Sequence, residues 1–545
     1  MSNKPSRREI LQMGVVLGTA GVAGGGAAEA RPPRAFALDE MTIDALQKAM
    51  ASGEHTSEQL VDLYRRRIHD IDVGGPSLNA VIELNPDAVS LARERDRERK
   101  AGKARGPLHG IPILLKDNIA THDRLQTTAG SLALVGSRPL RDAALVTRLR
   151  DAGAVILGKT NLSEWANLRS SHASSGWSGR GGQTHNPYAL DRTPSGSSSG
   201  SGAAVAASLA AIAVGSETDG SILSPSAAQS LVGIKPTVGL ISRSGIVPIS
   251  HSQDTAGPIA RTVRDAAILL GVLAGVDPDD SATQAPGRSA APDYTPFLRA
   301  DGLKGARIGI ARSHYFGYSI ATDRIAEEAI AVLKARGAVI VDPADIATAG
   351  QFDDSEFQVL LYEFKEDLNK YLAQLDPTGP NPRDLAGIIA FNDWEKAREM
   401  PFFAQELLLM AQAKGPLTSP DYLSLMAKNH DLARVKGIDA VMDAHQLDAL
   451  FAPTQGPPWL IDLANGDSGS GGSSTSPAAV AGYPSITVPA GFYYGLPIGV
   501  SFFGRAWSEP TLIRIAYAFE QATHARRPPT FAATATFPAN GRVAG

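Results

Sequence analysis

Apolar residues recur along this chain at two different intervals, and the two periods alternate. Segment 56–68 repeats leucine, tyrosine or isoleucine every three or four residues, and its start, T-S-E-Q, is typical of a helix capping box. Segment 111–115 is instead a short, nearly unbroken apolar run, which predicts a buried strand. Helices that alternate with buried strands indicate an α/β fold.

The same two patterns predict elements along most of the chain. Helices are expected over 42–51, 56–68, 88–100, 145–152, 203–211, 325–336 and 357–375, with 401–445 mainly helical. Strands are expected over 79–84, 111–115, 154–157, 307–311, 338–341, 485–489 and 498–503. A Gly- and Ser-rich stretch, 465–476, predicts a flexible loop without core residues. Neither an internal repeat nor a long linker interrupts 31–545, so one large domain is expected.

Composition narrows the possible functions. The 545 residues are 43% hydrophobic and 20% charged with a net charge of −4, and no basic block suggests a nucleic-acid partner. Beyond the N-terminus, no apolar stretch reaches the roughly 18 residues that span a bilayer, so no stable membrane anchor is expected. The chain has no cysteine, which excludes disulfides and thiol catalysis.

The N-terminus has the parts of a twin-arginine export signal. Arg7 and Arg8 precede a mild apolar run over 13–23, and Ala28-Glu29-Ala30 follows it. We therefore expect residues 1–30 to be an export signal, with cleavage after Ala30 and a periplasmic mature protein.

Two further motif matches are not expected to mark functional sites. Gly153–Thr160 fits the phosphate-binding pattern G-x-x-x-x-G-K-[ST], but its intervening residues are Ala-Val-Ile-Leu, whose N–H groups belong in a strand ladder. Gly196–Gly200 fits the nucleophile elbow G-x-S-x-G around Ser198, but a polar, proline-broken segment precedes it where the elbow requires a strand.

Metal catalysis is not expected either. The 11 histidines show no H-E-x-x-H or comparable ligand spacing. Those near the candidate site are more typical of hydrogen-bonded scaffold residues: His109, His172, His185 and His251.

A compact turn, Thr218-Asp219-Gly220-Ser221, is the strongest candidate for chemistry. Ser221 can act as a nucleophile if a base activates it. Successive N–H groups of such a turn can converge on one oxygen as an oxyanion hole, and Gly220 lets a substrate carbonyl approach closely.

Lys116, at the end of the apolar run 111–115, is the candidate base. Burial lowers the pKa of a lysine and so yields a neutral amine that can accept a proton. The alternative is an ion pair with Asp117, although adjacent strand side chains point to opposite faces. Ser197 could relay a proton between Lys116 and Ser221, because a hydroxyl both donates and accepts. Composition alone favours a flexible linker over 195–201.

These motifs together resemble the amidase signature family. The resemblance rests on G-I-P-I-L-L-K-D-N (110–118), S-G-S-S-S-G-S-G (195–202) and G-S-E-T-D-G-S-I-L-S-P-S (215–226). It implies a catalytic triad of Lys116, Ser197 and Ser221, a cis peptide at Gly196–Ser197, and oxyanion-hole N–H groups from 218–221, without metal or cofactor. It also implies an α/β/α fold, a central mixed sheet covered by helices, with a signature core over about 105–265 and a helical addition over about 352–445.

Further segments resemble the bacterial peptide amidases. These are G-K-T-N-L-S-E-W-A-N (158–167), G-G-Q-T-H-N-P-Y (181–188), S-Q-D-T-A-G-P (252–258), L-L-Y-E-F-K (360–365) and A-V-A-G-Y-P-S-I-T-V-P (479–489). The resemblance implies hydrolysis of the C-terminal carboxamide of peptides to the free acid and ammonia. A broader aryl or aliphatic amidase and a non-catalytic binding subunit are the alternatives, and a monomer is favoured. Against the family pattern, Ser195, Ser199 and Asp219 stand where glycine is common, which leaves the pocket shape open.

Overall fold

A computed structural model describes residues 36–469 and 472–537 of the chain. The expected export signal, 1–30, lies outside these described residues. The described residues all belong to one compact unit. Within the described part, no helix is both long enough and apolar enough to cross a bilayer.

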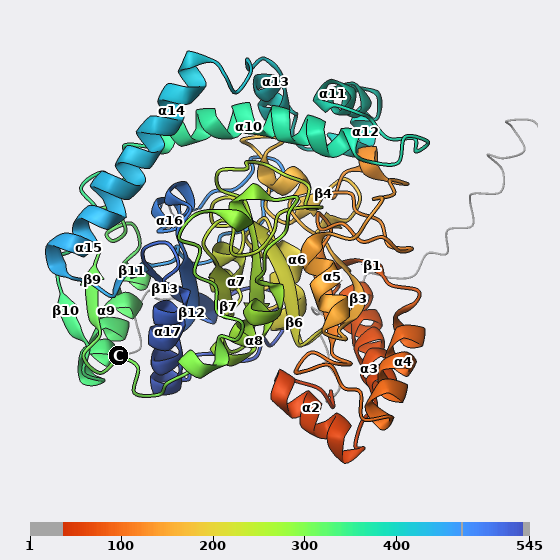
Figure 1. Cartoon of the computed structure of the whole chain (residues 1–545), viewed down its shortest axis with the longest axis horizontal. Coiled ribbons are helices and arrows are strands. Elements are labelled where there is room, and N and C mark those ends of the chain that lie inside the picture. The colour runs from red at the N-terminus through yellow and green to blue at the C-terminus, as the bar shows by residue number, and fades with distance from the viewer. Residues whose placement is uncertain (1–35, 470–471, 538–545) are drawn as a thin grey trace, which may run out of the picture. The chain divides into compact units, whose positions relative to one another are not determined.

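One mixed sheet of eleven strands organises the described residues (Figure 1). Neighbouring strands β2, β3 and β6 run parallel, as do β9, β10 and β11, whereas the pairs between these groups are antiparallel. In spatial order the strands are β1 (Val81–Leu84), β3 (Val155–Thr160), β2 (Pro112–Lys116), β6 (Ile212–Glu217), β8 (Thr255–Ala260), β7 (Val232–Lys235), β12 (Ser485–Tyr493), β13 (Leu496–Phe503), β11 (Ala449–Pro453), β9 (Arg307–Ile310) and β10 (Val339–Val341). A separate hairpin pairs β4 (Trp177–Ser178) with β5 (Gly182–Gln183).

Helices flank this sheet, so the predicted single-domain α/β architecture with a mixed sheet is confirmed. Helix α3 begins with the predicted capping box, in which Thr56 and Gln59 bond reciprocally. The helices are α2 (Ile43–Ser52), α3 (Ser57–Arg67), α4 (Ala88–Lys100), α5 (Ala144–Asp151), α6 (Ser199–Ala206), α7 (Leu223–Ala228), α8 (Val263–Leu273), α9 (Ile320–Ala335), α10 (Asp353–Ala373), α11 (Leu385–Trp394), α12 (Lys396–Glu399), α13 (Glu406–Gln412), α14 (Pro420–His430), α15 (Asp439–His445), α16 (Ser476–Ala481) and α17 (Glu509–Thr523).

Helix α6 begins four residues earlier than predicted, at Ser199, and the flexible-linker reading of 195–201 is wrong. The serines of this run and Gly200 are buried. A Cβ on Gly200 would lie 2.3 Å from the Ala80 carbonyl oxygen, so only glycine lets the helix approach its neighbours this closely. The small residues therefore serve close packing.

The loop 465–476 also differs from its prediction at its C-terminal end. Ser474 and Thr475 are buried, and Ser476 already begins α16. The Ser474 N–H donates to the Thr454 carbonyl oxygen at 3.1 Å, which joins the loop to the residue that follows β11. The prediction rested on polar composition, which does not reveal backbone hydrogen bonds of this kind.

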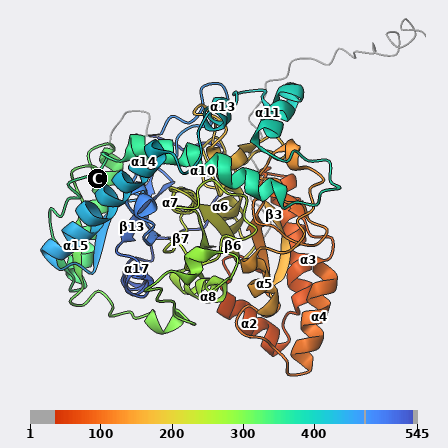
Figure 2. The same cartoon turned by 45° about the horizontal axis from the view of Figure 1, so that its top comes forward.

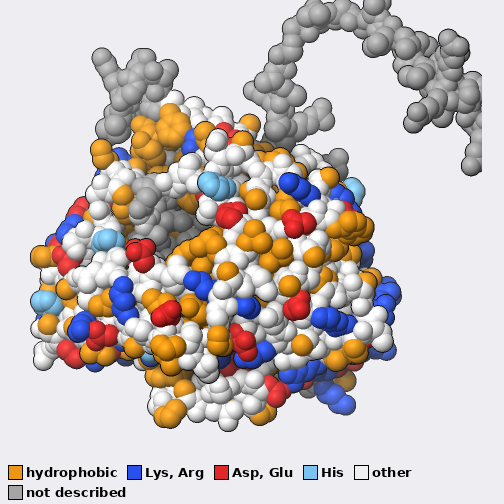
Figure 3. Space-filling model, turned by 90° about the horizontal axis from the view of Figure 1, so that it is seen from above, with side chains coloured by type: hydrophobic (Ala, Val, Ile, Leu, Met, Phe, Trp, Pro, Cys, Tyr) orange, Lys and Arg blue, Asp and Glu red, His pale blue; other side chains and the backbone are white. Residues whose placement is uncertain are grey.

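The segment 353–445 is mainly helical, as predicted, and α10, α11, α13 and α14 run together along one side of the sheet in both Figure 1 and Figure 2. Leu361, Phe364 and Leu368 of α10 belong to an apolar cluster that also contains Leu134 and Ile249 from outside the helical segment. Seen from above, this side is hollowed, and acidic, basic and apolar side chains are interspersed on it (Figure 3). Helix α10 thus lies where it can contact loops at the sheet's edge.

Candidate active site

Lys116 is the last residue of β2, and its side chain is fully buried. Its Nζ lies 2.8 Å from Ser197 Oγ, 3.0 Å from Ser216 Oγ and 3.1 Å from the Ser216 carbonyl oxygen. The alternative ion pair with Asp117 is wrong, because that carboxylate bonds to Arg180 instead, at 3.2 Å. Lys116 therefore faces hydroxyl and carbonyl oxygens.

Burial lowers the pKa of Lys116 to about 7, because an ammonium group loses its hydration in the protein interior. The negative charges of Asp254 and Glu217 oppose this effect and raise the pKa, but they do not restore the usual value. A neutral amine is therefore accessible to Lys116 near neutral pH.

Ser197 lies in the loop that leads into α6 and is fully buried. The Gly196–Ser197 peptide is cis, as the family resemblance implied. The Ser163 N–H donates to the Ser197 carbonyl oxygen at 3.1 Å. A Cβ on Gly196 would lie 2.4 Å from Ser163 Oγ, so glycine permits this close approach.

Ser221 lies in the turn between β6 and α7 and is 6% exposed. Glu217, the last residue of β6, accepts hydrogen bonds from the N–H groups of Ile222 and Leu223 at 2.7 and 2.9 Å. The carboxylate thus satisfies backbone donors at the start of α7, which have no partner within the helix. The Ser198 N–H donates to the Ser221 carbonyl oxygen at 3.1 Å. This bond joins the turn to the segment that carries Ser197.

The same turn holds a run of unused backbone donors. Within the described part of the chain, the N–H groups of Thr218, Asp219, Gly220 and Ser221 have no hydrogen-bond acceptor. Gly220 has φ +77°, a left-handed conformation that glycine adopts without strain. Adjacent free N–H groups in such a turn form an anion-binding concavity.

Three polar side chains beside these residues were not identified from the sequence. Ser216 Oγ accepts from both Lys116 Nζ and Asn118 Nδ2, the latter at 2.9 Å. Asp254 Oδ1 accepts from Thr218 Oγ1 at 2.6 Å. Asn118 and Asp254 lie within motifs that carried the family resemblance, but the motif letters do not reveal which atoms meet.

The structure supports the rejection of both motif matches. Val155, Ile156 and Leu157 are buried in β3, and Lys159 Nζ donates to the Ile119 carbonyl oxygen at 2.6 Å. Because Val155–Thr160 forms a strand, this segment has no open loop that could surround a phosphate.

The elbow reading around Ser198 fails for a different reason. A loop precedes this residue, and Ser198 Oγ donates to the Ser216 carbonyl oxygen at 3.1 Å. Its hydroxyl is therefore engaged in joining α6 to β6.

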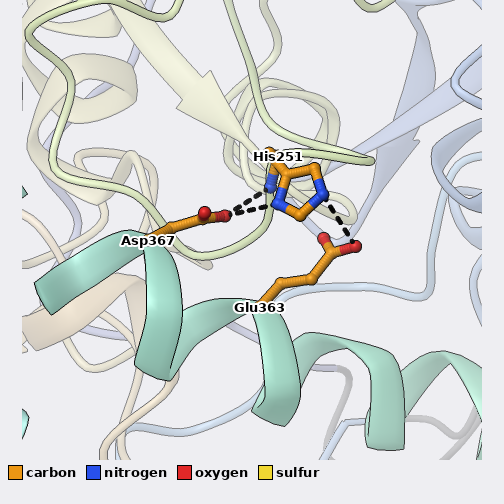
Figure 4. Close-up of side chains that lie close together, drawn as sticks. All are labelled: His251, Glu363 and Asp367. Atoms are coloured by element: carbon orange, nitrogen blue, oxygen red, sulfur yellow. Dashed lines mark hydrogen bonds and ion pairs between the residues drawn. The ribbon is translucent and has the colours of Figure 1, made fainter. Parts of the chain in front are cut away.

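His251, Glu363 and Asp367 form a cluster that the sequence did not indicate (Figure 4). His251 Nδ1 lies 2.8 Å from Asp367 Oδ2, and Nε2 lies 3.4 Å from Glu363 Oε1. One atom from each residue lies within 4.8 Å of the others, as in metal sites. Each imidazole nitrogen already faces a carboxylate, however, and Tyr422 OH donates to Glu363 at 2.7 Å, so the cluster works as a charged link between its elements.

Residues 59–513 match the Amidase family. This chain belongs to that family. The protein is an amidase of the amidase signature fold, a hydrolase that acts on amide substrates, as the serine and lysine motifs predicted.

Solved structures and curated relatives extend the likeness over nearly the whole chain. Native peptide amidase from Stenotrophomonas maltophilia is 52% identical, with a TM-score of 0.87 and coverage of 91% of this chain and 100% of that one. The peptide amidase PAM, solved with the competitive inhibitor chymostatin, is 53% identical with the same TM-score and coverage. A probable amidase of Arabidopsis thaliana is 44% identical over 521 residues, which are 93% of this chain and 95% of that protein.

Proposed function

We propose that this amidase hydrolyses the C-terminal carboxamide of peptides, with Ser221 as nucleophile, Ser197 as proton relay and Lys116 as base. The observation that carries the proposal is the 2.8 Å contact between Ser197 Oγ and the fully buried Lys116 Nζ. The substrate class is supported by similarity to peptide amidases over 91% of the chain.

The contacts of Lys116 suit a neutral base. A neutral amine has two N–H groups and one lone pair. The two oxygens of Ser216 can accept the two N–H groups, since both lie within 3.1 Å of Nζ. The lone pair is then directed at Ser197, whose hydroxyl hydrogen it can accept.

Acylation follows from this arrangement. Ser221 Oγ attacks the terminal amide carbon and passes its proton to Ser197 Oγ, which passes its own proton to Lys116 Nζ. The carbonyl π electrons move to the oxygen, and the free N–H groups of 218–221 bind that oxyanion. Lys116 then returns a proton through Ser197 to the leaving nitrogen, the C–N bond breaks, and ammonia departs.

Deacylation repeats the proton path with water as the nucleophile. Water adds to the acyl carbon and transfers a proton through Ser197 to Lys116. The tetrahedral adduct then breaks its bond to Ser221 Oγ, which regains a proton by the reverse route. The products are the peptide acid and ammonia, and the three side chains return to their starting states.

The decisive experiment measures ammonia release from a panel of C-terminally amidated dipeptides and from simple aryl and aliphatic amides. We expect the peptide amides to have the higher kcat/KM, with internal peptide bonds left intact in mass spectra. Preference for the simple amides would instead favour the broader amidase. Ser221→Ala serves as the blank for contaminating activities.

A fluorophosphonate probe tests the assignment of Ser221 directly, because such probes phosphonylate an activated serine. We expect labelling at Ser221, and its absence in Ser221→Ala. An unlabelled wild-type protein would contradict the assignment of Ser221 as the nucleophile.

A further inference from the structure

Helix α10 presents three acidic side chains to one loop beside the catalytic turn. Glu356, Glu363 and Asp367 are spaced seven and four residues apart, which places them on one helical face. The loop they meet is 249–254, which we call the turn-support loop. It leads directly into β8.

Two of these carboxylates hold the middle of the turn-support loop. Glu363 Oε2 accepts from the N–H and hydroxyl of Ser252 at 3.1 and 2.9 Å. Asp367 Oδ2 accepts from the His251 N–H and Nδ1 at 3.0 and 2.8 Å (Figure 4). Charged acceptors form the stronger class of hydrogen bond, so α10 sets the position of the loop.

The third carboxylate reaches the catalytic turn through Gln253. Gln253 Nε2 donates to Glu356 Oε1 at 2.8 Å and to the Thr218 carbonyl oxygen at 3.3 Å. Gln253 is 1% exposed and Glu356 is 7% exposed, so water does not compete for these bonds. Asp254, next in the loop, accepts from the Thr218 hydroxyl.

Packing alone does not hold this region. A cavity of about 250 Å³ adjoins α10 and the turn-support loop, and its lining includes Thr218, Asp254 and Asp367. Where such space adjoins a turn, hydrogen bonds rather than close contacts fix its backbone.

Burial raises the pKa of Glu356 well above its usual value, and the nearby carboxylate of Asp219 adds to the rise. This rise favours the protonated form of Glu356. A protonated carboxyl group can lie beside Asp219 without repulsion while its other oxygen accepts from Gln253.

We propose that Gln253 and Glu356 are positioning residues for the oxyanion hole, an inference that rests on the proposed hydrolytic role of the 218–221 turn. The Thr218 carbonyl and the Asp219 N–H belong to one planar trans peptide and point in opposite directions. Gln253 holds the carbonyl, and so aims the Asp219 N–H at the oxygen that becomes charged. Helix α10 is thus part of the support of the reaction centre.

The first experiment compares four variants on a peptide amide that the wild type hydrolyses. Gln253→Met and Glu356→Leu should lower kcat about 10- to 100-fold with little change in KM, because the donor is misdirected only where the oxyanion forms. Glu356→Gln should retain most of the activity, since its amide can accept from Gln253 and donate to Asp219. Glu366→Gln is the control, because this residue is 45% exposed on the same helix.

A second readout separates positioning from a loss of folding. A peptide aldehyde forms a tetrahedral adduct with a nucleophilic serine, whereas the peptide acid product does not. In Gln253→Met the affinity for the aldehyde should fall in parallel with kcat, while inhibition by the acid stays the same. Equal losses for both ligands, or a wild-type kcat in Gln253→Met and Glu356→Leu, would overturn the positioning role.

The two proposals fail in different ways. If the wild-type protein releases no ammonia, or if Ser221→Ala remains active, the hydrolytic mechanism itself is wrong. If Ser221-dependent hydrolysis is present but the Gln253 and Glu356 variants match the Glu366→Gln control, only the positioning role is wrong.

Discussion

Lys116 Nζ and Ser197 Oγ lie 2.8 Å apart, although 81 residues separate the two in the chain. Strand β2 pairs with β6, and helix α6 packs on both strands, so the end of β2 meets the loop that enters α6. The lysine contacts a hydroxyl that it can deprotonate, in an environment that lowers its pKa. The first prediction, on the role of Lys116, rests on this contact and on the lowered pKa.

Replacing Lys116 by alanine should lower kcat about 10²- to 10⁴-fold, the usual contribution of a general base. In the wild type, kcat/KM should rise with pH and level off above about 7, because the pKa of Lys116 is lowered to that value and only the neutral amine accepts a proton. Steady-state ammonia release across pH measures both effects. A near-normal rate in Lys116→Ala, or a flat wild-type profile, would assign the base elsewhere.

Ser221→Ala should abolish ammonia release, since no other hydroxyl replaces the attacking oxygen. Ser90→Ala is the matched control, because Ser90 is an exposed residue of α4 whose hydroxyl donates to the Asp87 carbonyl oxygen of its own helix turn. Substantial activity in Ser221→Ala, measured under single-turnover conditions, would contradict the nucleophile assignment.

Gly220→Ala should reduce kcat about 10²-fold. A Cβ at this position, where φ is +77°, would lie 2.9 Å from Ser224 Oγ and 3.1 Å from Thr475 Oγ1, so either these side chains or the turn must shift. Gly287→Ala isolates the backbone effect, because Gly287 has the same φ and no atom within 4 Å of its Cβ position. We expect Gly287→Ala to keep its activity at a stability cost of about 1–2 kcal/mol. Equal activity in the two variants would exclude a steric role of the turn.

His251 should contribute to stability in a pH-dependent way. Burial lowers the pKa of His251, but the hydrogen bond to Asp367 and the charges of Glu363 and Asp367 raise it above 6.5 overall, with Arg243 opposing. The contribution of the charged form is therefore fully present below pH 6.5 and is lost as the pH rises through the raised value.

Thermal unfolding of His251→Gln checks this expectation. The difference in melting temperature from the wild type should be larger at about pH 5.5 than at about pH 8.5. His69→Gln is the control, since the His69 side chain is 84% exposed. A difference that is independent of pH would show that His251 acts through packing alone.

The export prediction rests on the sequence and can be tested in a bacterium with a twin-arginine pathway. Substituting Arg7 and Arg8 by lysine should leave the protein in the cytoplasmic fraction, whereas Arg31→Lys, just beyond the expected cleavage site, should not. Cell fractionation and N-terminal sequencing of the wild type measure location and cleavage. A wild-type protein that stays cytoplasmic would contradict the prediction.

Local sequence patterns predicted much of the fold. The capping box at Thr56 and the apolar run of β2 describe interactions between residues that are near one another in the chain, so their periodicity is sufficient evidence. The serine and glycine run was less certain, because its composition suits both a flexible linker and a tightly packed helix. The close approach of Gly200 to Ala80, which decides between them, is a long-range contact.

The sequence by itself determined the family, through motifs that carry Lys116, Ser197 and Ser221, and with it the α/β architecture. Only the tertiary structure decided what surrounds these residues. The pKa of Lys116 depends on burial from all sides, and the link from Glu356 through Gln253 to Thr218 joins three segments far apart in the chain. Desolvation and side-chain hydrogen bonds arise from how elements pack, and no local pattern encodes that packing.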